Sequence, residues 1–294
     1  MKPRTQYSLF ALGAGGMAAF LLATEPRDLD MALLDDADGV GLVGSALDGE
    51  LIYHAAGCAS CHSAEGTDAL SGGKSFISAF GTFYAPNIST HLENGIGEWS
   101  TYDLANAIMA GVSPDGAHYY PAFPYTTYAK MDVQDTVDLI AYLRSLPEDA
   151  SPSRDHDVGF PFNIRRLLGG WKMLFASDDW VVADVSTPEL ERGRYLVEAL
   201  GHCAECHTPR NPLGGLQTDE WMRGAENPSG EGRVPSIHPD DLGWSVGDIT
   251  YYLETGFTPD FDTAGGNMVD VVVNTAKLPA EDREAIAAYL VALP

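Results

Sequence analysis

The stretch Cys58-Ala-Ser-Cys61-His62 recurs as Cys203-Ala-Glu-Cys206-His207, and these two stretches contain all four cysteines of the chain. In a Cys-x-x-Cys-His pentapeptide the two thiols can form thioether bonds to a haem macrocycle, and the adjacent imidazole can bind the iron. The pattern therefore predicts two covalently attached haem c groups. The predicted attachment residues are Cys58, Cys61, Cys203 and Cys206, and the predicted proximal iron ligands are His62 and His207.

Two other chemistries use a Cys-x-x-Cys pair. A zinc site would need two further ligands near each pair, and a thioredoxin-like redox pair does not require a histidine directly after the second cysteine. The complete pentapeptide occurs twice and leaves no cysteine over, which favours haem. The same count excludes disulfides, because a bridge would consume a haem thiol.

The length and charge of the chain limit its organisation and its partners. At 294 residues it can form two domains of roughly 100–150 residues, one for each motif. The formal charge is −25, from 17 basic and 42 acidic residues, which argues against nucleic acid as a partner. Such a surface suits a basic redox partner, although acidity can also serve solubility or a saline habitat.

An uncharged stretch runs from Tyr7 to Thr24, between a basic N-terminus and an acidic run. This pattern predicts an export signal, in agreement with periplasmic haem attachment in bacteria. Because no small-x-small cleavage site follows the stretch, we expect an uncleaved hydrophobic helix that anchors the protein in the membrane, with a removed signal peptide as the alternative. The basic residues before it place the haem domains on the periplasmic side of the inner membrane.

Self-similarity continues beyond the motifs and indicates a duplicated domain. In each copy a Trp-Ser-x-x-Asp stretch predicts a helix with serine at its N-cap and glycine at its end. The residues that keep the 145-residue offset of the motifs are Trp99 and Trp244, Ser100 and Ser245, Asp103 and Asp248, Gly111 and Gly256, Pro114 and Pro259, and Asp115 and Asp260.

Each copy should open with a short helix that leads into its motif and close with an apolar-periodic helix, over 133–146 and 280–293. Strand-like alternation of useful length is absent from the sequence, so the predicted fold class is all-α. Between the copies, the apolar stretch 160–175 is predicted as an interdomain helix that buries its Phe, Leu and Trp side chains, with a docking surface for a partner subunit or the membrane as the alternative. The predicted organisation is a signal or anchor helix over 1–24, a tether over 25–47, a first haem domain over 48–150, a linker over 151–188 and a second haem domain over 189–294.

The ligand on the opposite face of each iron decides the chemistry. Methionine closes the site at a relatively high potential, histidine closes it at a lower one, and an open site allows small-ligand or peroxide chemistry. In the second copy we predict Met268, which follows a flexible glycine loop, because Met222 comes too soon after the motif to wrap around a haem. In the first copy we predict Met131, which ends an aromatic and proline loop, over Met109 or His118.

Two further features concern the surroundings of the haems. Pro86-Asn87-Ile88 and Pro235-Ser236-Ile237 recur at similar places in the copies, and such a loop could offer a backbone carbonyl to the free nitrogen of the proximal histidine. His54 and His202 lie next to the motifs in sequence. We expect both to be hydrogen-bonded or surface histidines rather than ligands, with a place at the haem edge as the alternative.

These motifs resemble bacterial dihaem and trihaem cytochromes c, which act as electron-transfer subunits of membrane-bound alcohol, gluconate and related dehydrogenases, together with stand-alone relatives. The resemblance covers nearly everything after residue 45. It implies two tandem cytochrome c domains with His/Met ligation, and so supports Met131 and Met268, but the third attachment motif of the trihaem subunits is missing. The motifs that carry it are Gly201-His-Cys-Ala-Glu-Cys-His-Thr-Pro-Arg-Asn211, Tyr120-Pro-Ala-Phe-Pro-Tyr-Thr-Thr-Tyr-Ala-Lys-Met131, the stretch 160–175, and Gly266-Asn-Met268 followed by Asn274-Thr275.

Together these features predict a dihaem c-type cytochrome that carries single electrons in the periplasm. The expected donor is a dehydrogenase or a quinol-oxidising protein, and the expected acceptor is a cytochrome or oxidase of a respiratory chain. The protein itself is predicted to make no substrate bond. The alternatives are a dihaem peroxidase and a haem-based ligand sensor, both of which need an iron with an open or exchangeable site.

Overall fold

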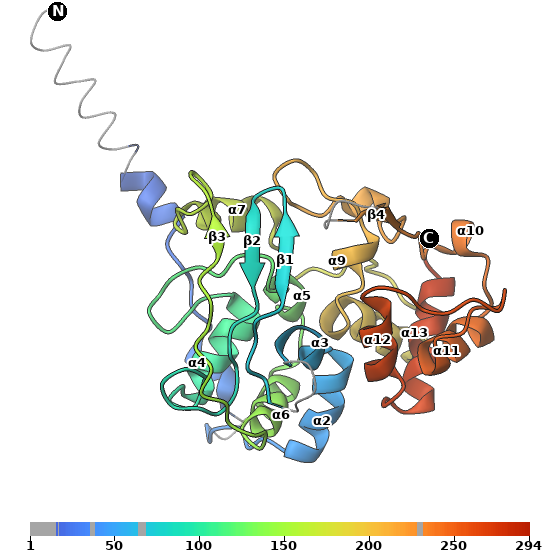
Figure 1. Ribbon diagram of the computed structural model, residues 1–294, viewed down its shortest axis with the longest axis horizontal. Coiled ribbons are helices and arrows are strands. Elements are labelled where there is room, and N and C mark those ends of the chain that lie inside the picture. The colour runs from blue at the N-terminus through green and yellow to red at the C-terminus, as the bar shows by residue number, and fades with distance from the viewer. Residues whose placement is uncertain (1–15, 17, 36–38, 64–68, 228–231) are drawn as a thin grey trace, which may run out of the picture.

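The computed structural model describes residues 16, 18–35, 39–63, 69–227 and 232–294, in which two mainly helical halves lie side by side (Figure 1). The first half contains η1 (Met31–Leu34), α2 (Ala46–Ala55), α3 (Cys58–His62), β1 (Ser75–Ser78), β2 (Gly81–Tyr84), α4 (Thr101–Ala105), η2 (Asn106–Ala110), α5 (Tyr125–Tyr128) and α6 (Val133–Leu143). A connecting stretch carries β3 (Asp157–Val158) and α7 (Leu167–Phe175). The second half contains α8 (Pro188–Tyr195), η3 (Leu196–Leu200), α9 (Ala204–His207), η4 (Thr218–Glu220), β4 (Ala225–Glu226), β5 (Arg233–Val234), α10 (Pro239–Leu242), α11 (Val246–Thr255), α12 (Met268–Thr275) and α13 (Ala280–Val291).

The repeated Trp-Ser-x-x-Asp stretches begin helices, as predicted. Asp103 N–H donates to Ser100 Oγ over 3.1 Å, and Ser100 N–H donates to the Asp103 carboxylate over 2.9 Å. The equivalent serine and aspartate of the second half make the same pair of bonds at the start of α11. This reciprocal capping satisfies backbone donors that the first helical turn leaves open, so a local signal in the sequence fixes both helix starts.

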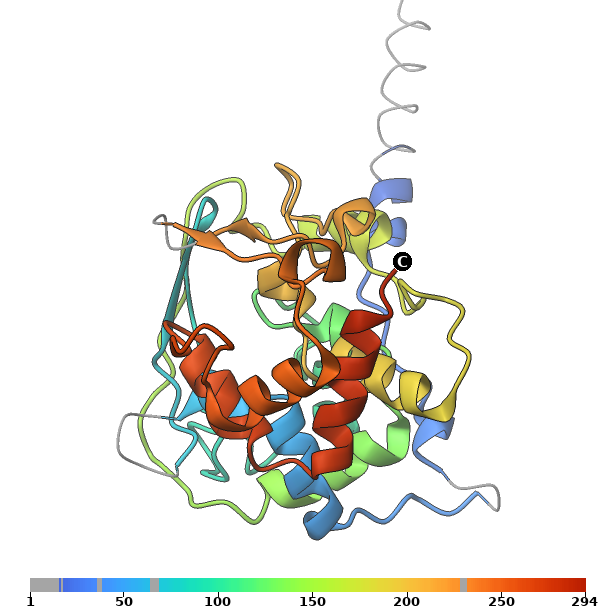
Figure 2. The same cartoon turned by 90° about the vertical axis from the view of Figure 1, so that its right-hand side faces the viewer.

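The opening and closing helices of each half cross at a glycine. A Cβ atom added to Gly49 in α2 would lie 1.9 Å from Asp138 O in α6, and one added to Gly193 in α8 would lie 2.1 Å from Ala285 O in α13. Neither distance is sterically possible, so only glycine permits these close crossings. Figure 2 shows the second of them, where α13 runs beside α8.

The all-α prediction is wrong, because the described residues also form two small antiparallel sheets. In the first sheet Phe76 of β1 pairs with Phe83 of β2, and Gly81 of β2 pairs with Val158 of β3. The second sheet pairs β4 with β5. Strands of four residues or fewer are too short to show a period of two in the sequence, which is why the pattern missed them.

The predicted hydrophobic anchor helix over 1–24 is not borne out either. Residues 1–15 and 17 lie outside the described part of the chain, and no helix within that part is long and apolar enough to cross a membrane. From Thr24 onward, the segment packs on the first half. Thr24 O accepts from His118 Nε2 over 3.0 Å, and Leu29 N–H donates to Asn106 Oδ1 over 3.0 Å. Residues 24–29 therefore contact the first half directly.

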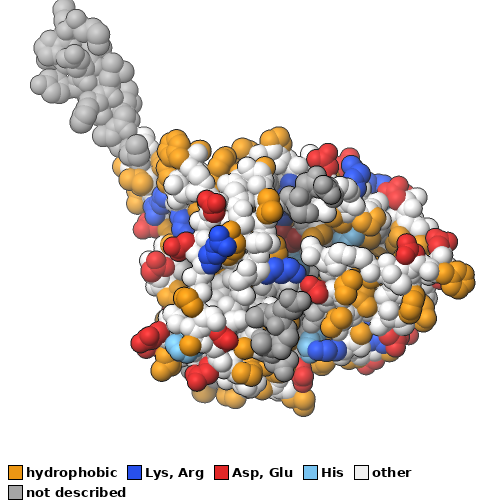
Figure 3. Space-filling view, viewed as in Figure 1, with side chains coloured by type: hydrophobic (Ala, Val, Ile, Leu, Met, Phe, Trp, Pro, Cys, Tyr) orange, Lys and Arg blue, Asp and Glu red, His pale blue; other side chains and the backbone are white. Residues whose placement is uncertain are grey.

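Within the stretch 160–175 only Leu167–Phe175 forms an α-helix, α7, and the prediction that the large apolar side chains of the stretch are buried is wrong for several of them. Phe160 is 82% exposed, and Phe162, Met173 and Leu174 are also exposed. Hydrogen bonds tie α7 to both halves, because Lys172 Nζ donates to Ala110 O over 2.7 Å and Trp171 Nε1 donates to Leu213 O over 3.0 Å. Apolar side chains are visible at the surface near the position of α7, among others on the same face (Figure 3).

Replacing Gly193 with Ala should destabilise the protein by about 1–3 kcal/mol, because the added Cβ forces α8 away from α13. The control is Gly247→Ala in α11, where a Cβ would meet only Ser245 Oγ at 3.8 Å. That variant should be neutral or gain up to about 1 kcal/mol from helix propensity. Denaturant unfolding of the haem-loaded protein compares the two, and equal stabilities would rule out a steric role for Gly193.

Candidate functional site

The two attachment motifs form short helices that start at tight turns. Helix α3 spans the whole first motif, and α9 spans the last four residues of the second. Gly57, with a φ of 61°, turns the chain into α3, and His202, with a φ of 40°, occupies the equivalent turn before the second motif. No disulfide joins any of the four cysteines. Each motif therefore presents two thiols and a histidine on one short helical segment.

A backbone carbonyl holds each proximal histidine, as the recurring proline loops predict. His62 Nδ1 lies 2.8 Å from Pro86 O, and His207 Nδ1 lies 2.8 Å from Pro235 O. Because a carbonyl oxygen can only accept, Nδ1 carries the proton and Nε2 keeps its lone pair. This is the tautomer that an iron ligand requires, and the bond also fixes the plane of the ring.

A glycine N–H donates a hydrogen bond to the backbone carbonyl of each proximal histidine. Gly72 N–H donates to His62 O over 2.7 Å, and Gly224 N–H donates to His207 O over 2.7 Å. Both glycines have positive φ, 75° and 79°. A Cβ on Gly72 would lie 2.4 Å from Ala85 O, so a side chain there would push away the loop that supplies the Pro86 carbonyl.

Burial favours the neutral forms of both histidines and of the cysteine thiols to which the haems attach. Burial lowers the pKa of His62 and of His207, against the opposing effect of their carbonyl hydrogen bonds. Burial also raises the pKa of Cys58 and of Cys203 to about 12. At neutral pH each site therefore offers a neutral imidazole and uncharged thiols, in surroundings that suit an apolar macrocycle.

The predicted distal methionines lie in different environments. Met131 is 4% exposed and lies between α5 and α6, within the core. Met268 is half-buried and is the first residue of α12. Met222 is fully buried, and its N–H donates to Thr208 Oγ1 over 3.0 Å, directly after the second motif. The distal assignments of Met131 and Met268 stay predictions, with Met222 as the comparison residue in the second half.

His118, the alternative distal ligand in the first half, has a structural role. Its side chain is 3% exposed, and Nε2 lies 3.0 Å from Thr24 O. That bond holds the segment entering the first half, which occupies the nitrogen that most often binds iron. The contact argues against His118 as a ligand.

Three residues that lie beside the motifs in space connect the two halves. His54 Nδ1 lies 3.1 Å from Asn274 Oδ1, and His202 Nε2 lies 3.2 Å from Ala56 O. Both histidines are thus hydrogen-bonded, as the sequence led us to expect. The role of Asn274 was not predicted, and the only signal for it was its place in the Asn274-Thr275 motif of the resembled family.

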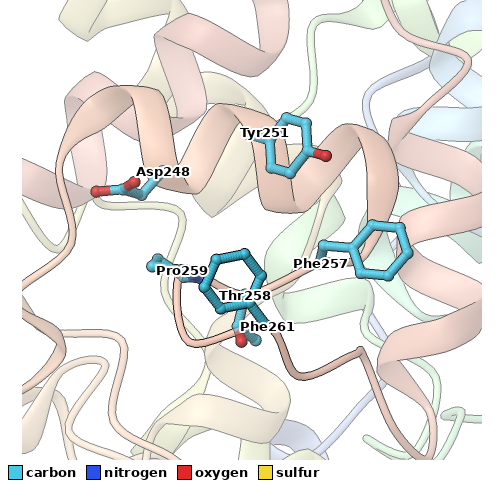
Figure 4. Close-up of a pocket in the computed structure, with 6 residues that line it drawn as sticks. All are labelled: Asp248, Tyr251, Phe257, Thr258, Pro259 and Phe261. Carbon is cyan, nitrogen blue, oxygen red and sulfur yellow. The ribbon is translucent and has the colours of Figure 1, made fainter.

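Two cavities accompany these sites. One of about 100 Å³ lies at the junction of the halves, where its lining includes Lys130 of the first half and His202 and Ala204 of the second. The other, of about 400 Å³, is an open aromatic hollow in the second half (Figure 4). It contains none of the predicted haem residues. Its lining residues are Asp248, Tyr251, Phe257, Thr258, Pro259 and Phe261.

The open hollow reflects a difference between the copies. Phe257 is 49% exposed, whereas its repeat counterpart Val112 is fully buried; Tyr251 is 53% exposed, whereas its counterpart Asn106 is 4% exposed. In the first half, residues 24–29 cover this face through the bond from Leu29 N–H to Asn106 Oδ1. The equivalent face of the second half is exposed within the described residues.

Two Cys-x-x-Cys-His helices with carbonyl-held histidines define a c-type haem protein. The sequence profile of the family "Cytochrome c" matches residues 46–147. The chain is 51% identical to "Diheme cytochrome c-type" of Cereibacter sphaeroides over 282 residues, which is 94% of each chain. It is 36% identical to a nicotinate dehydrogenase subunit of Pseudomonas putida, covering 96% of this chain and 24% of that one. It is 35% identical to "Gluconate 2-dehydrogenase cytochrome c subunit" of Pantoea cypripedii, in an alignment that covers 89% of this chain and 62% of that one.

The chain belongs to the dihaem c-type cytochromes, and it is an electron-transfer protein that carries two covalently bound haem c groups. The donor set fits this cofactor in both halves, with Cys58 and Cys61 or Cys203 and Cys206 for attachment and the free Nε2 of the following histidine for the iron. The chain spans less than two thirds of the length of its dehydrogenase relatives.

Replacing Gly72 with Ala should cost about 1–3 kcal/mol more stability than replacing its neighbour Gly73, because only the former brings a Cβ against the Pro86 loop. Gly73 also has positive φ, 97°, but a Cβ there would meet nothing within 4 Å. Both variants introduce backbone strain, but only Gly72→Ala should displace the Pro86 carbonyl, so comparing the two separates these effects. Gly72→Ala should also perturb the ferric spectrum of the first haem. Equal stability losses with unchanged spectra would contradict the proposed role of the glycine.

Proposed function

We propose that this cytochrome carries single electrons in the bacterial periplasm, from a dehydrogenase or another quinol-linked donor to a cytochrome or oxidase of a respiratory chain. Haem c supplies one-electron chemistry, with its iron alternating between ferrous and ferric states. The chain's own residues attach the cofactors, fix the proximal imidazoles and exclude water. In this proposal the substrate is oxidised on a separate catalytic protein.

The observation that carries the proposal is the pair of equivalent histidine sites, each held by a proline carbonyl at 2.8 Å. An imidazole fixed in this way moves little when the iron changes oxidation state, which lowers the structural change at the proximal ligand in each electron transfer. The relatives named for gluconate dehydrogenase and nicotinate dehydrogenase support a dehydrogenase as the donor. The net charge of −25 supports partners that present basic surfaces.

The test of the proposed donor is whether it reduces the haems, and not only whether it binds the cytochrome. The haem protein should be recovered in the periplasmic fraction of its host, and a dehydrogenase that co-purifies with it should reduce both haems when its own substrate is added. Gluconate, simple alcohols and nicotinate are the first substrates to compare. Haems that stay ferric while the co-purified dehydrogenase turns over with an artificial acceptor would refute the proposed donor. Rapid turnover of hydrogen peroxide would favour the peroxidase alternative.

We further propose that Met131 and Met268 each bind the distal face of one iron. Replacing Met131 with Ala should open the first haem to carbon monoxide, and replacing it with His should keep that haem six-coordinate at a lower potential. The near-infrared charge-transfer band of ferric Met-ligated haem should fall by about half in each single variant, because two similar sites contribute to it.

Two buried methionines serve as matched controls. Met109 in η2 is 8% exposed, and Met222 is fully buried, so their replacement by Ala creates cavities of similar size. Met109→Ala and Met222→Ala should lower stability but leave the charge-transfer band intact. A band that persists in Met268→Ala and falls in Met222→Ala would move the second assignment to Met222.

A further inference from the structure

The segments that lead into the two attachment motifs touch each other. His202, which directly precedes Cys203, donates from Nε2 to Ala56 O over 3.2 Å, and Tyr128 OH donates to the same carbonyl over 3.2 Å. Ala56 lies two residues before Cys58. The backbone next to one haem attachment site is therefore hydrogen-bonded to the side chain next to the other.

Helix α12, which begins at Met268, packs on the first attachment motif. Asn274 Nδ2 donates to Ser60 Oγ over 3.1 Å, and Ser60 is one of the two residues between Cys58 and Cys61. Asn274 Nδ2 also donates to Asp270 O over 2.8 Å, which fixes the orientation of the amide. Asn274 Oδ1 then accepts from His54 Nδ1 over 3.1 Å.

The hydrogen bonds of the Asn274 amide contribute more to the stability of this contact than the ion pair beside them. Lys74 Nζ binds Asp270 Oδ2 over 3.0 Å and Ser60 O over 2.8 Å, but the two charged side chains are 33% and 47% exposed. Exposed pairs of this kind contribute about 0–1 kcal/mol. Asn274 is 5% exposed, so loss of its partners would leave buried polar groups unsatisfied, at a cost of about 1–3 kcal/mol. Asn274 is thus the main polar contact of α12 with the first half.

The segment of Met131, in the first half, is in turn hydrogen-bonded to the second half. Asp132 N–H donates to Tyr195 OH over 3.0 Å, and Tyr195 OH donates to Asp135 Oδ2 over 2.5 Å. Asp132 directly follows Met131 and caps α6. Each predicted methionine segment is therefore held in part by the other half of the protein.

We propose that Asn274 is a positioning residue that couples the two haem sites, by holding α12, through its last turn, against the attachment helix of the first haem. The inference rests on the proposed function in one respect, the role of Met268 as a distal ligand. The hydrogen bonds of Asn274 do not depend on that role. Because reduction potential depends on axial ligation, hydrogen bonding and burial, a change at one site should alter the other through this contact. The two haems then act as one coupled redox unit.

The experiment compares Asn274→Leu with Thr275→Val in the holoprotein. Thr275 is the adjacent residue of α12 and is also buried, but its Oγ1 donates to Leu253 O over 2.6 Å, inside the second half. The control thus removes a hydrogen bond from the same helix without breaking the junction. Ser60→Ala, which removes only the hydroxyl that Asn274 contacts, serves as a milder second variant if Asn274→Leu folds poorly.

Proton NMR of the ferric protein resolves the methyl resonances of each haem, and a dithionite titration gives both potentials. Asn274→Leu and Ser60→Ala should each shift the resonances and potential of the haem at Cys58 and Cys61, and each should also shift those of the haem at Cys203 and Cys206. Thr275→Val should leave the first haem unchanged. A double-mutant cycle of Ser60→Ala with Asn274→Ala should be non-additive for the first potential.

The coupling is refuted if Asn274→Leu alters only the second haem, or if Thr275→Val shifts the first haem equally. It is likewise refuted if Ser60→Ala leaves the second haem unchanged and the double-mutant cycle is additive. Dithionite reduces the haems without any protein donor, so these outcomes do not depend on the dehydrogenase. Failure of the proposed donor would appear instead as haems that dithionite reduces but that substrate and dehydrogenase do not.

Discussion

The hydrogen bond from a proximal imidazole to a proline carbonyl is the constraint on which each half depends. Pro86 O and Pro235 O lie 2.8 Å from Nδ1 of their histidines. The small sheets supply these carbonyls, because β2 ends at Tyr84, two residues before Pro86, and β5 ends at Val234, directly before Pro235. Strands of two to four residues therefore position the group that sets the histidine tautomer and ring plane.

The junction shows how duplicated halves can become one unit. Polar side chains that cross it, among them Asn274 and His202, lie next to the haem motifs. Hydrogen bonds are directional and a buried polar group must find a partner, so the contacts of the buried Asn274 and the partly buried His202 fix the relative placement of the halves more specifically than apolar contact would. Apolar burial supplies most of the stability, and these hydrogen bonds select one arrangement.

The copies have diverged where they meet other parts of the chain. The turn that carries Val112 is covered by residues 24–29, whereas the equivalent turn around Phe257 is exposed. The stretch around α7 likewise leaves Phe160 exposed while Lys172 and Trp171 hold it to both halves. Acidic side chains are spread over the visible face (Figure 3), so a partner meets a broadly anionic surface interrupted by apolar ones.

The sequence by itself determined the features that are written in local patterns. The haem attachment residues, the duplication, the Ser100 capping box and the recurring proline loops need only short spacings and side-chain chemistry. Tertiary structure decided what depends on neighbours distant in the chain. The strands β1 to β5 form because partner backbones lie beside them, Gly193 is required because another helix crosses there, and Asn274 acts because folding brings Ser60 and His54 to its amide. Periodicity reports which face of an element is apolar, but it contains no information on which distant polar group will meet it.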